Sequence, residues 1–146
     1  MKSKLLNDQG ETIWAVVFDK GDQVIAGLTT FAREHGLDSA HFTAIGAFER
    51  ATLGYFQRDR KQYKEIPIDE QVEVLSLVGD IALLGDEPKI HAHAVVGRED
   101  GTTRGGHLIE ATVWPTLEVF LAETPGYLAK LHDQETGLAL FDLGQG

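Results

Sequence analysis

Three histidines fall on two neighbouring stretches of the chain, with a spacing suited to a metal site. His91 and His93 belong to the apolar run 90–96, and His107 follows a pair of glycines at 105–106. Residues two apart on a β-strand share a face, so the first two imidazoles project to one side, about 6.6 Å apart along the strand. Two imidazoles at this spacing can bind a single metal ion.

The hairpin between the two stretches decides whether the third histidine joins them. If Asp100-Gly101 formed a two-residue turn, His107 would lie opposite Ala94, on the wrong face. If the loop is instead Glu99-Asp100-Gly101, a type I turn closed by a left-handed glycine, His107 lies directly opposite His93. The Cβ atoms of the two histidines would then be about 5 Å apart.

The second register is favoured because Gly101 occupies the loop position that prefers a left-handed residue, although a bulge at Gly105-Gly106 would shift it by one. We therefore predict that His91, His93 and His107 share a face. Three neutral histidines with an open fourth position match a zinc site that holds water and lowers the pKa of that water to near 7. Nickel, iron and manganese accept the same ligands, and ordinary polar residues on a solvated strand are the alternative interpretation.

The sequence identifies no general acid or base, so the catalytic residues stay unassigned. Glu110 is a tempting fourth ligand, but in the favoured register it points away from the histidines, and we interpret it as an exposed or interface carboxylate. Glu49 and Arg50, at the junction of two predicted strands, are the other candidates, although a solvated turn explains them better. His41 and His132 belong to no motif and are predicted to be surface or capping residues.

Short apolar runs predict that strands surround these residues. A run at 117–122 fits a helix or a strand equally well, and the strand that begins at Val72 continues to Leu84 if the chain passes a bend at Gly79-Asp80. The predicted strands are Thr12–Phe18, His41–Phe48, Ala51–Phe56, Tyr63–Ile68, Val72–Val78, Ile90–Val96, His107–Trp114 and Leu138–Phe141.

One segment has the pattern of an amphipathic helix. Apolar residues recur at helical spacing from Val24 to Ala32, Asp22 is the expected N-cap, and Gly36 stands where a C-terminal glycine belongs. His35, in the last turn, would complement the helix dipole. Many strands with one early helix predict an α+β fold, a mostly antiparallel sheet with the helix packed against it.

Length and composition narrow the class of protein. The chain has 146 residues, no cysteine and a formal net charge of −10, which suits a single domain over residues 1–146. Disulfides, thiolate zinc sites and cysteine nucleophiles are excluded. Apolar runs reach only about six residues, against about 20 for a membrane span, and the N-terminus lacks the apolar region of a secretory signal. We expect a cytoplasmic protein with no membrane partner.

Charge also argues against direct binding of nucleic acid. The chain carries 13 Lys+Arg against 23 Asp+Glu, whereas DNA binding depends largely on cations that neutralise phosphates. The one basic cluster, over Arg58–Lys64, is interrupted by Asp59 and followed by Glu65. We interpret it as a solvated turn or strand edge.

The pattern His91-x-His93 with Gly105-Gly106-His107-Leu108 resembles the PPC (plants and prokaryotes conserved) domain. Supporting similarity extends over a core of roughly residues 8–143. The supporting segments are Ile45–Phe48, Ala51–Phe56, Val72–Gly79 and Thr136–Leu138.

This resemblance implies an α+β fold, a homotrimer formed through sheet surfaces, and zinc bound by His91, His93 and His107, as in some prokaryotic members. The fold is similar to that of acetolactate decarboxylase and of a zinc-dependent ester hydrolase, which is only an analogy for function. Plant members add an AT-hook, an Arg-Gly-Arg-Pro element that this chain lacks, and many bacterial relatives carry a DNA-binding label.

Three functions follow as hypotheses. The first is a metal-binding homotrimer that acts on a small carbonyl or ester substrate, with its ligand at a subunit interface. The second is a non-catalytic assembly or regulatory module that reaches DNA only through partners. The third is a domain that a metal stabilises without any reaction.

Overall fold

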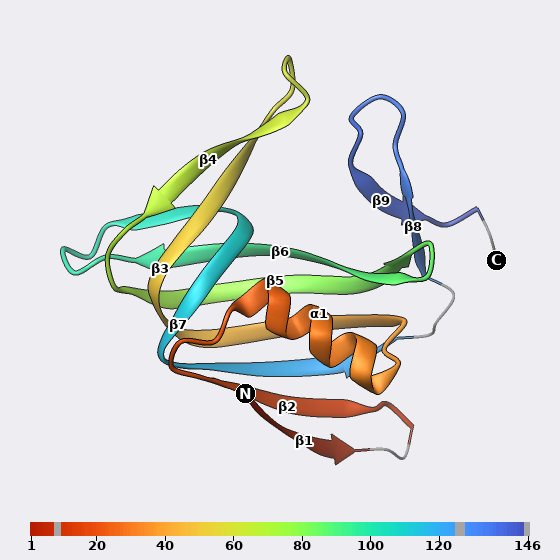
Figure 1. Cartoon of the computed structure of the whole chain (residues 1–146), viewed down its shortest axis with the longest axis horizontal. Helices are drawn as coiled ribbons and strands as arrows, with labels where there is room; N and C mark the ends of the chain where they lie inside the picture. Colours follow the sequence, from red (N-terminus) through yellow and green to blue (C-terminus); the bar gives the residue numbers. More distant parts are fainter. Residues whose placement is uncertain (8–9, 125–127, 145–146) are drawn as a thin grey trace.

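The computed structural model describes residues 1–7, 10–124 and 128–144 (Figure 1). Within these ranges the chain forms nine strands and one helix. In chain order the elements are β1 (Lys2–Asn7), β2 (Ile13–Asp19), α1 (Val24–His35), β3 (Ser39–Gln57), β4 (Gln62–Ile68), β5 (Val72–Leu84), β6 (Glu87–Gly97), β7 (Thr103–Glu123), β8 (Ala129–His132) and β9 (Ala139–Asp142).

All nine strands belong to one sheet, in the order β1-β2-β7-β3-β5-β8-β9, with β4 paired to β3. Every pairing is antiparallel except β5 with β8. Both β3 and β6 pair with β5 and with β7, so these four long strands are hydrogen bonded in a closed circuit. The prediction of a mostly antiparallel sheet with one helix is confirmed, but strands dominate the fold rather than balancing helix.

Several strands are longer than the sequence predicted. β3 continues through Glu49-Arg50, which forms an irregularity in one strand rather than a turn between two. β7 extends from Thr103 through residues 117–122, so that ambiguous run is a strand. β5 passes through Gly79-Asp80 to Leu84 without interruption. Because these long strands pair side by side, residues from distant parts of the chain come together.

The helix begins one residue later than expected. Gln23 is the N-cap of α1, whereas the carboxylate of Asp22 accepts a hydrogen bond from the Asp19 amide at 2.9 Å and pairs with the N-terminal ammonium at 2.8 Å. Gly36 ends the helix in the left-handed region, with φ of 62°, as predicted. No helix in the described part of the chain has the length and apolar character needed to cross a membrane.

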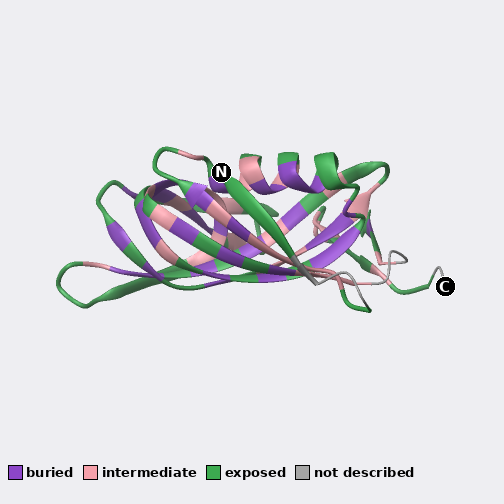
Figure 2. Ribbon diagram, turned by 90° about the horizontal axis from the view of Figure 1, so that it is seen from below, coloured by how far each residue is buried: buried purple, intermediate pink, exposed green. Residues whose placement is uncertain are grey.

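The core lies between α1 and one face of the sheet, and Figure 2 shows the helix along that face. The buried side of the helix consists of Val24, Leu28, Phe31 and Ala32. Each large side chain so buried contributes about 1.5–3 kcal/mol to the hydrophobic free energy of folding. Gly27 lets the helix approach closely, since a Cβ there would lie 2.5 Å from the ring of Phe18. His91 and His93 alternate along β6 with buried residues of this core, so they lie on the other face of that strand.

Candidate metal centre

The hairpin that joins β6 to β7 has the register in which the histidines meet. His93 pairs directly with His107, and no bulge interrupts the ladder that follows. The amide of Arg98 donates to the carbonyl of Thr102 at 2.9 Å, which closes a three-residue loop. Gly101 has φ of 79°, the left-handed conformation on which the register prediction depended.

Two glycines on neighbouring strands leave room for close packing at this point. A Cβ on Gly106 would lie 2.7 Å from the carbonyl oxygen of Gly54 in β3. A Cβ on Gly54 would in turn lie 2.8 Å from the ring of Tyr63. Because both side chains are absent, Tyr63 reaches across β3 and stacks on His107, with ring centroids 4.5 Å apart and planes 17° apart. The stack holds the imidazole of His107 in one plane.

The three predicted histidines come together. One ring nitrogen from each of His91, His93 and His107 lies within 4.8 Å of the others. The Nε2 atoms of His91 and His93 are 3.3 Å apart. Two nitrogens that bind one tetrahedral zinc ion at about 2.0–2.1 Å are separated by about 3.3–3.4 Å, so this pair already has the required spacing.

The protonation and hydrogen bonding of the rings also suit a metal. Burial lowers the pKa of His107 to about 4, assisted by the nearby positive charges of His91, His93, Lys89 and Lys130. Burial and the neighbouring His91 likewise lower the pKa of His93. Both rings are therefore neutral at pH 7 and offer a lone pair. The buried Nδ1 of His107 has no hydrogen-bond partner among the residues that the structure describes, which a metal ion or a water molecule would satisfy.

An outer carboxylate that the sequence did not reveal orients His91. Asp80 lies directly opposite His91 in the β5–β6 register, and its Oδ2 is 3.4 Å from the Nδ1 of His91. Its other oxygen accepts a hydrogen bond from Lys130, whose side chain is only 2% exposed. A carboxylate behind a histidine fixes the ring orientation and raises its basicity. Asp80 therefore turns the Nε2 of His91 toward the other histidines.

Asp80 is ionised in this setting. Burial alone would raise the pKa of Asp80, but the hydrogen bonds from His91 and Lys130 outweigh burial and hold it below its usual range. A lone aspartate within the otherwise uncharged segment 74–84 was the available signal. The role of Asp80 was missed because Gly79-Asp80 was interpreted as a bend. The position of Asp80 beside His91 follows only from the β5–β6 register.

A cavity of about 440 Å³ lies beside two of the three histidines. It opens where β6 and β7 separate, because β6 pairs with β7 only from His93 to Gly97. His91 and His107 contribute to its wall. His132, predicted to be a surface residue, is exposed and also lines it. We call this space the histidine cavity.

Glu110 is neither a ligand nor a free surface carboxylate. It is half-buried, and its two oxygens accept hydrogen bonds from the amides of Ile25 at 3.0 Å and Ala26 at 3.4 Å. Glu110 therefore caps the N-terminus of α1 from strand β7, where its negative charge also complements the helix dipole. The prediction that it points away from the histidines agrees with this position, and the exposed or interface role is corrected.

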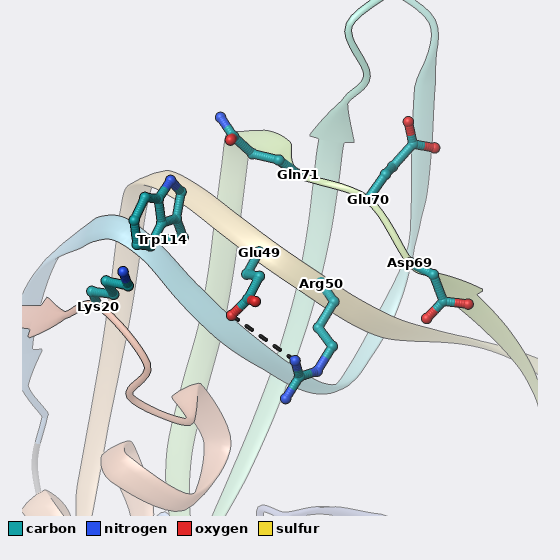
Figure 3. A pocket seen from close by; sticks show the side chains of 7 residues that line it. All are labelled: Lys20, Glu49, Arg50, Asp69, Glu70, Gln71 and Trp114. Carbon is teal, nitrogen blue, oxygen red and sulfur yellow. Dashed lines mark ion pairs between the residues drawn. The ribbon is translucent and has the colours of Figure 1, made fainter.

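Glu49 and Arg50 lie in a different depression, shown in Figure 3. This cleft, of about 660 Å³, shares no lining residue with the histidine cavity. The two side chains form an ion pair with N···O of 3.9 Å. The structure therefore does not bring them to the histidines. We call this depression the Trp114 cleft; its lining is Lys20, Glu49, Arg50, Asp69, Glu70, Gln71 and Trp114.

Comparison with known proteins gives one family-model match and several close structural matches. The model of the Plants and Prokaryotes Conserved (PCC) domain matches residues 6–125. A plant- and prokaryote-conserved protein from Pyrococcus horikoshii has a TM-score of 0.85 and 30% identity, over 97% of this chain and 94% of that one. A metal-containing protein from Archaeoglobus fulgidus has a TM-score of 0.82 and 30% identity, over 97% and 99%. A candidate DNA-binding protein from Ralstonia eutropha JMP134 has a TM-score of 0.83 and 31% identity, over 89% and 90%.

Two more distant similarities bear on the fold and on chain length. A Staphylococcus aureus protein of unknown function, similar to α-acetolactate decarboxylase, has a TM-score of 0.57 at 12% identity, over 83% of this chain and 53% of that one. This confirms the expected similarity of fold alone. The bifunctional protein GlmU of Synechococcus sp. (strain JA-3-3Ab) is 30% identical over 120 residues, which are 80% of this chain and 18% of that protein. The chain thus spans under a fifth of that relative.

Proposed function

Because the chain belongs to the Plants and Prokaryotes Conserved (PCC) domain family, we propose that it is a homotrimeric metal-binding protein that acts on a small carbonyl or ester compound. The metal is held by His91, His93 and His107, and zinc fits these three nitrogen ligands best. The observation that carries the proposal is the convergence of the three ring nitrogens within 4.8 Å. The name of the metal-containing relative from Archaeoglobus fulgidus supports it.

The chemistry follows from the open position that three histidines leave. A bound zinc ion supplies polarisation of a carbonyl group and acidification of a water molecule. The chain contributes orientation: Asp80 fixes His91, and Tyr63 packs flat on His107. The histidine cavity adjoins this position and is large enough for a small organic molecule.

Metal content per protomer tests the proposal directly. Untagged protein, exposed to zinc and freed of excess, is analysed for metals beside a His91→Ala/His93→Ala variant. We expect close to one zinc per protomer in the natural protein and none in the variant. Absence of metal from both would contradict the proposal, and a positive result would justify a screen of esters, lactones and β-keto acids.

The open face of the sheet supports the homotrimer. His93, Val78, Thr43 and Phe120 stand in one row across β6, β5, β3 and β7, because each is the register partner of the next. Val78 is 48% exposed and Phe120 is 59% exposed, which is unusual for large apolar side chains on a central sheet face. Ile45, Leu75 and Val95 add further exposed apolar surface nearby in these strands. Assembly through this face would place a neighbouring subunit beside His93 and the ligand.

Sedimentation equilibrium measures the assembly. We expect a particle of three times the protomer mass of 16.0 kDa, and a shift to the monomer in a Val78→Asp/Phe120→Asp variant. A monomeric natural protein at micromolar concentration would remove the trimer from the proposal and leave the metal site intact.

The second candidate is a non-catalytic assembly module that reaches DNA through partners. The exposed apolar face and the description of the Ralstonia eutropha relative favour it. Direct contact with DNA predicts a steep fall in duplex affinity as salt rises. With a net charge of −10, we expect no duplex binding at physiological salt. A trimer that binds zinc, turns over no carbonyl or ester compound and captures a partner would favour this module.

A further inference from the structure

The lining of the histidine cavity has a charge composition opposite to that of the whole chain. Among the described residues, every charged side chain that lines it is cationic: Lys89 and Lys130, beside His91, His107 and His132. No aspartate or glutamate belongs to the described lining, although the chain has 23 acidic residues against 13 Lys+Arg. An anion is therefore the charged ligand that this cavity can accept.

The rest of the wall is apolar. The volume of about 440 Å³ lies within the range of about 300–1,000 Å³ that is typical of small-molecule sites. A ligand that fills it must therefore bury hydrocarbon as well as charge. The apolar lining comes from α1, β5, β7, β9 and the segment that leads into β9, and includes Ile25, Leu84, Leu108, Ile109, Leu138 and Leu140.

The two lysines have different roles. Lys130 is 2% exposed, and its ammonium group already donates to Asp80. Lys89 is exposed, shares the strand face of His91, and forms no ion pair with any described residue. Lys89 lines the histidine cavity together with His91 and His107. Lys89 is therefore the cation left for a ligand.

We propose that the histidine cavity binds a small organic monocarboxylate, with its carboxylate paired to Lys89 and its hydrocarbon body among the apolar side chains. One lysine suits a single negative charge, whereas a phosphate group would call for several cations or an arginine fork. Any reaction of this ligand rests on the proposed function. A carbonyl or ester group on the same molecule would face His91 and His107, where we propose that the metal binds. The binding step itself needs only the cavity and Lys89.

Calorimetric titration of the untagged full chain tests the binding step with defined probes. Hexanoate, hexylamine and acetate are titrated into zinc-loaded and metal-free protein, and the same titrations are made with Lys89→Gln and Lys64→Gln. Lys64, an exposed lysine on β4 outside the cavity, is the matched control. We expect hexanoate to bind at least about tenfold more tightly than hexylamine or acetate, and Lys89→Gln to lose about tenfold. Lys64→Gln should bind hexanoate like the natural protein.

Zinc content, measured on the same samples, separates this inference from the proposed function. Lys89→Gln should keep the full zinc content. Equal affinity for hexanoate and hexylamine, or unchanged hexanoate affinity in Lys89→Gln, would overturn the carboxylate site even if zinc is bound. Lys89-dependent hexanoate binding by a protein that takes up no zinc would establish the carboxylate site and reject the metal centre.

Discussion

The Trp114 cleft is larger than the histidine cavity, about 660 Å³ against about 440 Å³, and four of the five charged side chains that line it already contact another residue. Glu49 pairs with Arg50, and the ammonium of Lys20 lies 3.6 Å above the ring of Trp114 (Figure 3). In the histidine cavity, by contrast, a buried nitrogen of His107 lacks a partner within the described structure, and Lys89 pairs with no described carboxylate.

This difference shows that size does not identify the candidate site. Native proteins satisfy nearly all of their buried polar groups, so a buried polar group left without a partner indicates that a water molecule, an ion or a ligand binds there. The five charged side chains of the Trp114 cleft are all exposed, so water can solvate them and they need no ligand. The three histidines instead hold their ring nitrogens within 4.8 Å of one another, an arrangement that a bound metal ion would use. Four sets of substitutions test this contrast.

The largest effect should come from removing one ligand. Loss of an outer-shell partner costs about 10–100-fold in metal affinity, so we expect His107→Ala to lower zinc affinity by more than about 100-fold. The double substitution Glu49→Gln/Arg50→Gln in the Trp114 cleft should change zinc affinity less than about twofold. Competition with a chelating indicator measures both. A comparable loss in the cleft variant would end the distinction between the two regions.

Asp80 should affect both metal affinity and stability. Asp80→Ala removes the partner of His91, with an expected loss of about 10–100-fold in zinc affinity. It also leaves the buried ammonium of Lys130 unpaired, which we expect to lower the free energy of unfolding by roughly 3–5 kcal/mol.

A double variant separates these two effects of Asp80. In Asp80→Ala/Lys130→Met the buried charge is gone, so urea denaturation should show stability close to that of the natural protein. Zinc affinity should stay low, because His91 still lacks its carboxylate. Recovery of zinc affinity in the double variant would show that Asp80 acts only by neutralising Lys130.

Glu110 should matter for stability but not for metal. Removal of a helix cap costs about 0.5–2 kcal/mol, so Glu110→Ala should lower the free energy of unfolding by about 1 kcal/mol through fraying of α1. Zinc content should remain that of the natural protein. Glu110→Gln, which keeps an acceptor oxygen, should lose less stability, and a loss of zinc from either variant would reopen a ligand role.

The smallest effect should come from the contact between Lys20 and Trp114. An exposed cation–π pair contributes about 0.5–1 kcal/mol, so Lys20→Ala should shift thermal unfolding by a few degrees at most. Hexanoate and zinc binding should be unaffected, because Lys20 lies in the Trp114 cleft alone. Any change in ligand affinity would indicate that the two regions communicate.

Local patterns in the sequence determined which three histidines are the candidate metal ligands. The spacing of His91 and His93 placed both rings on one strand face, and Gly101 selected the turn that puts His107 opposite His93. These features depend on contacts within about 20 residues, where strand periodicity and turn stereochemistry dominate. The apolar pattern of α1 and the glycine at its end are of the same kind.

The partners of these residues were decided by the tertiary structure. Glu110 caps a helix 85 residues away, and Lys130 reaches Asp80 across 50 residues. The bend assigned to Gly79-Asp80 and the junction assigned to Glu49-Arg50 were wrong because long strands pass through both. Pairing on both sides of a strand overrides the local preference for a turn.

The sequence alone therefore determined which side chains converge as candidate ligands, because strand periodicity and one turn are local properties. Only the tertiary structure decided what stands behind and beside them: the carboxylate of Asp80, the ring of Tyr63, and a cavity without acidic side chains in its described lining. These depend on the register between β5 and β6, on the pairing of β3 with both β4 and β7, and on the point where β6 and β7 separate. The physical reason is that such packing is set by the whole sheet at once rather than by any single segment.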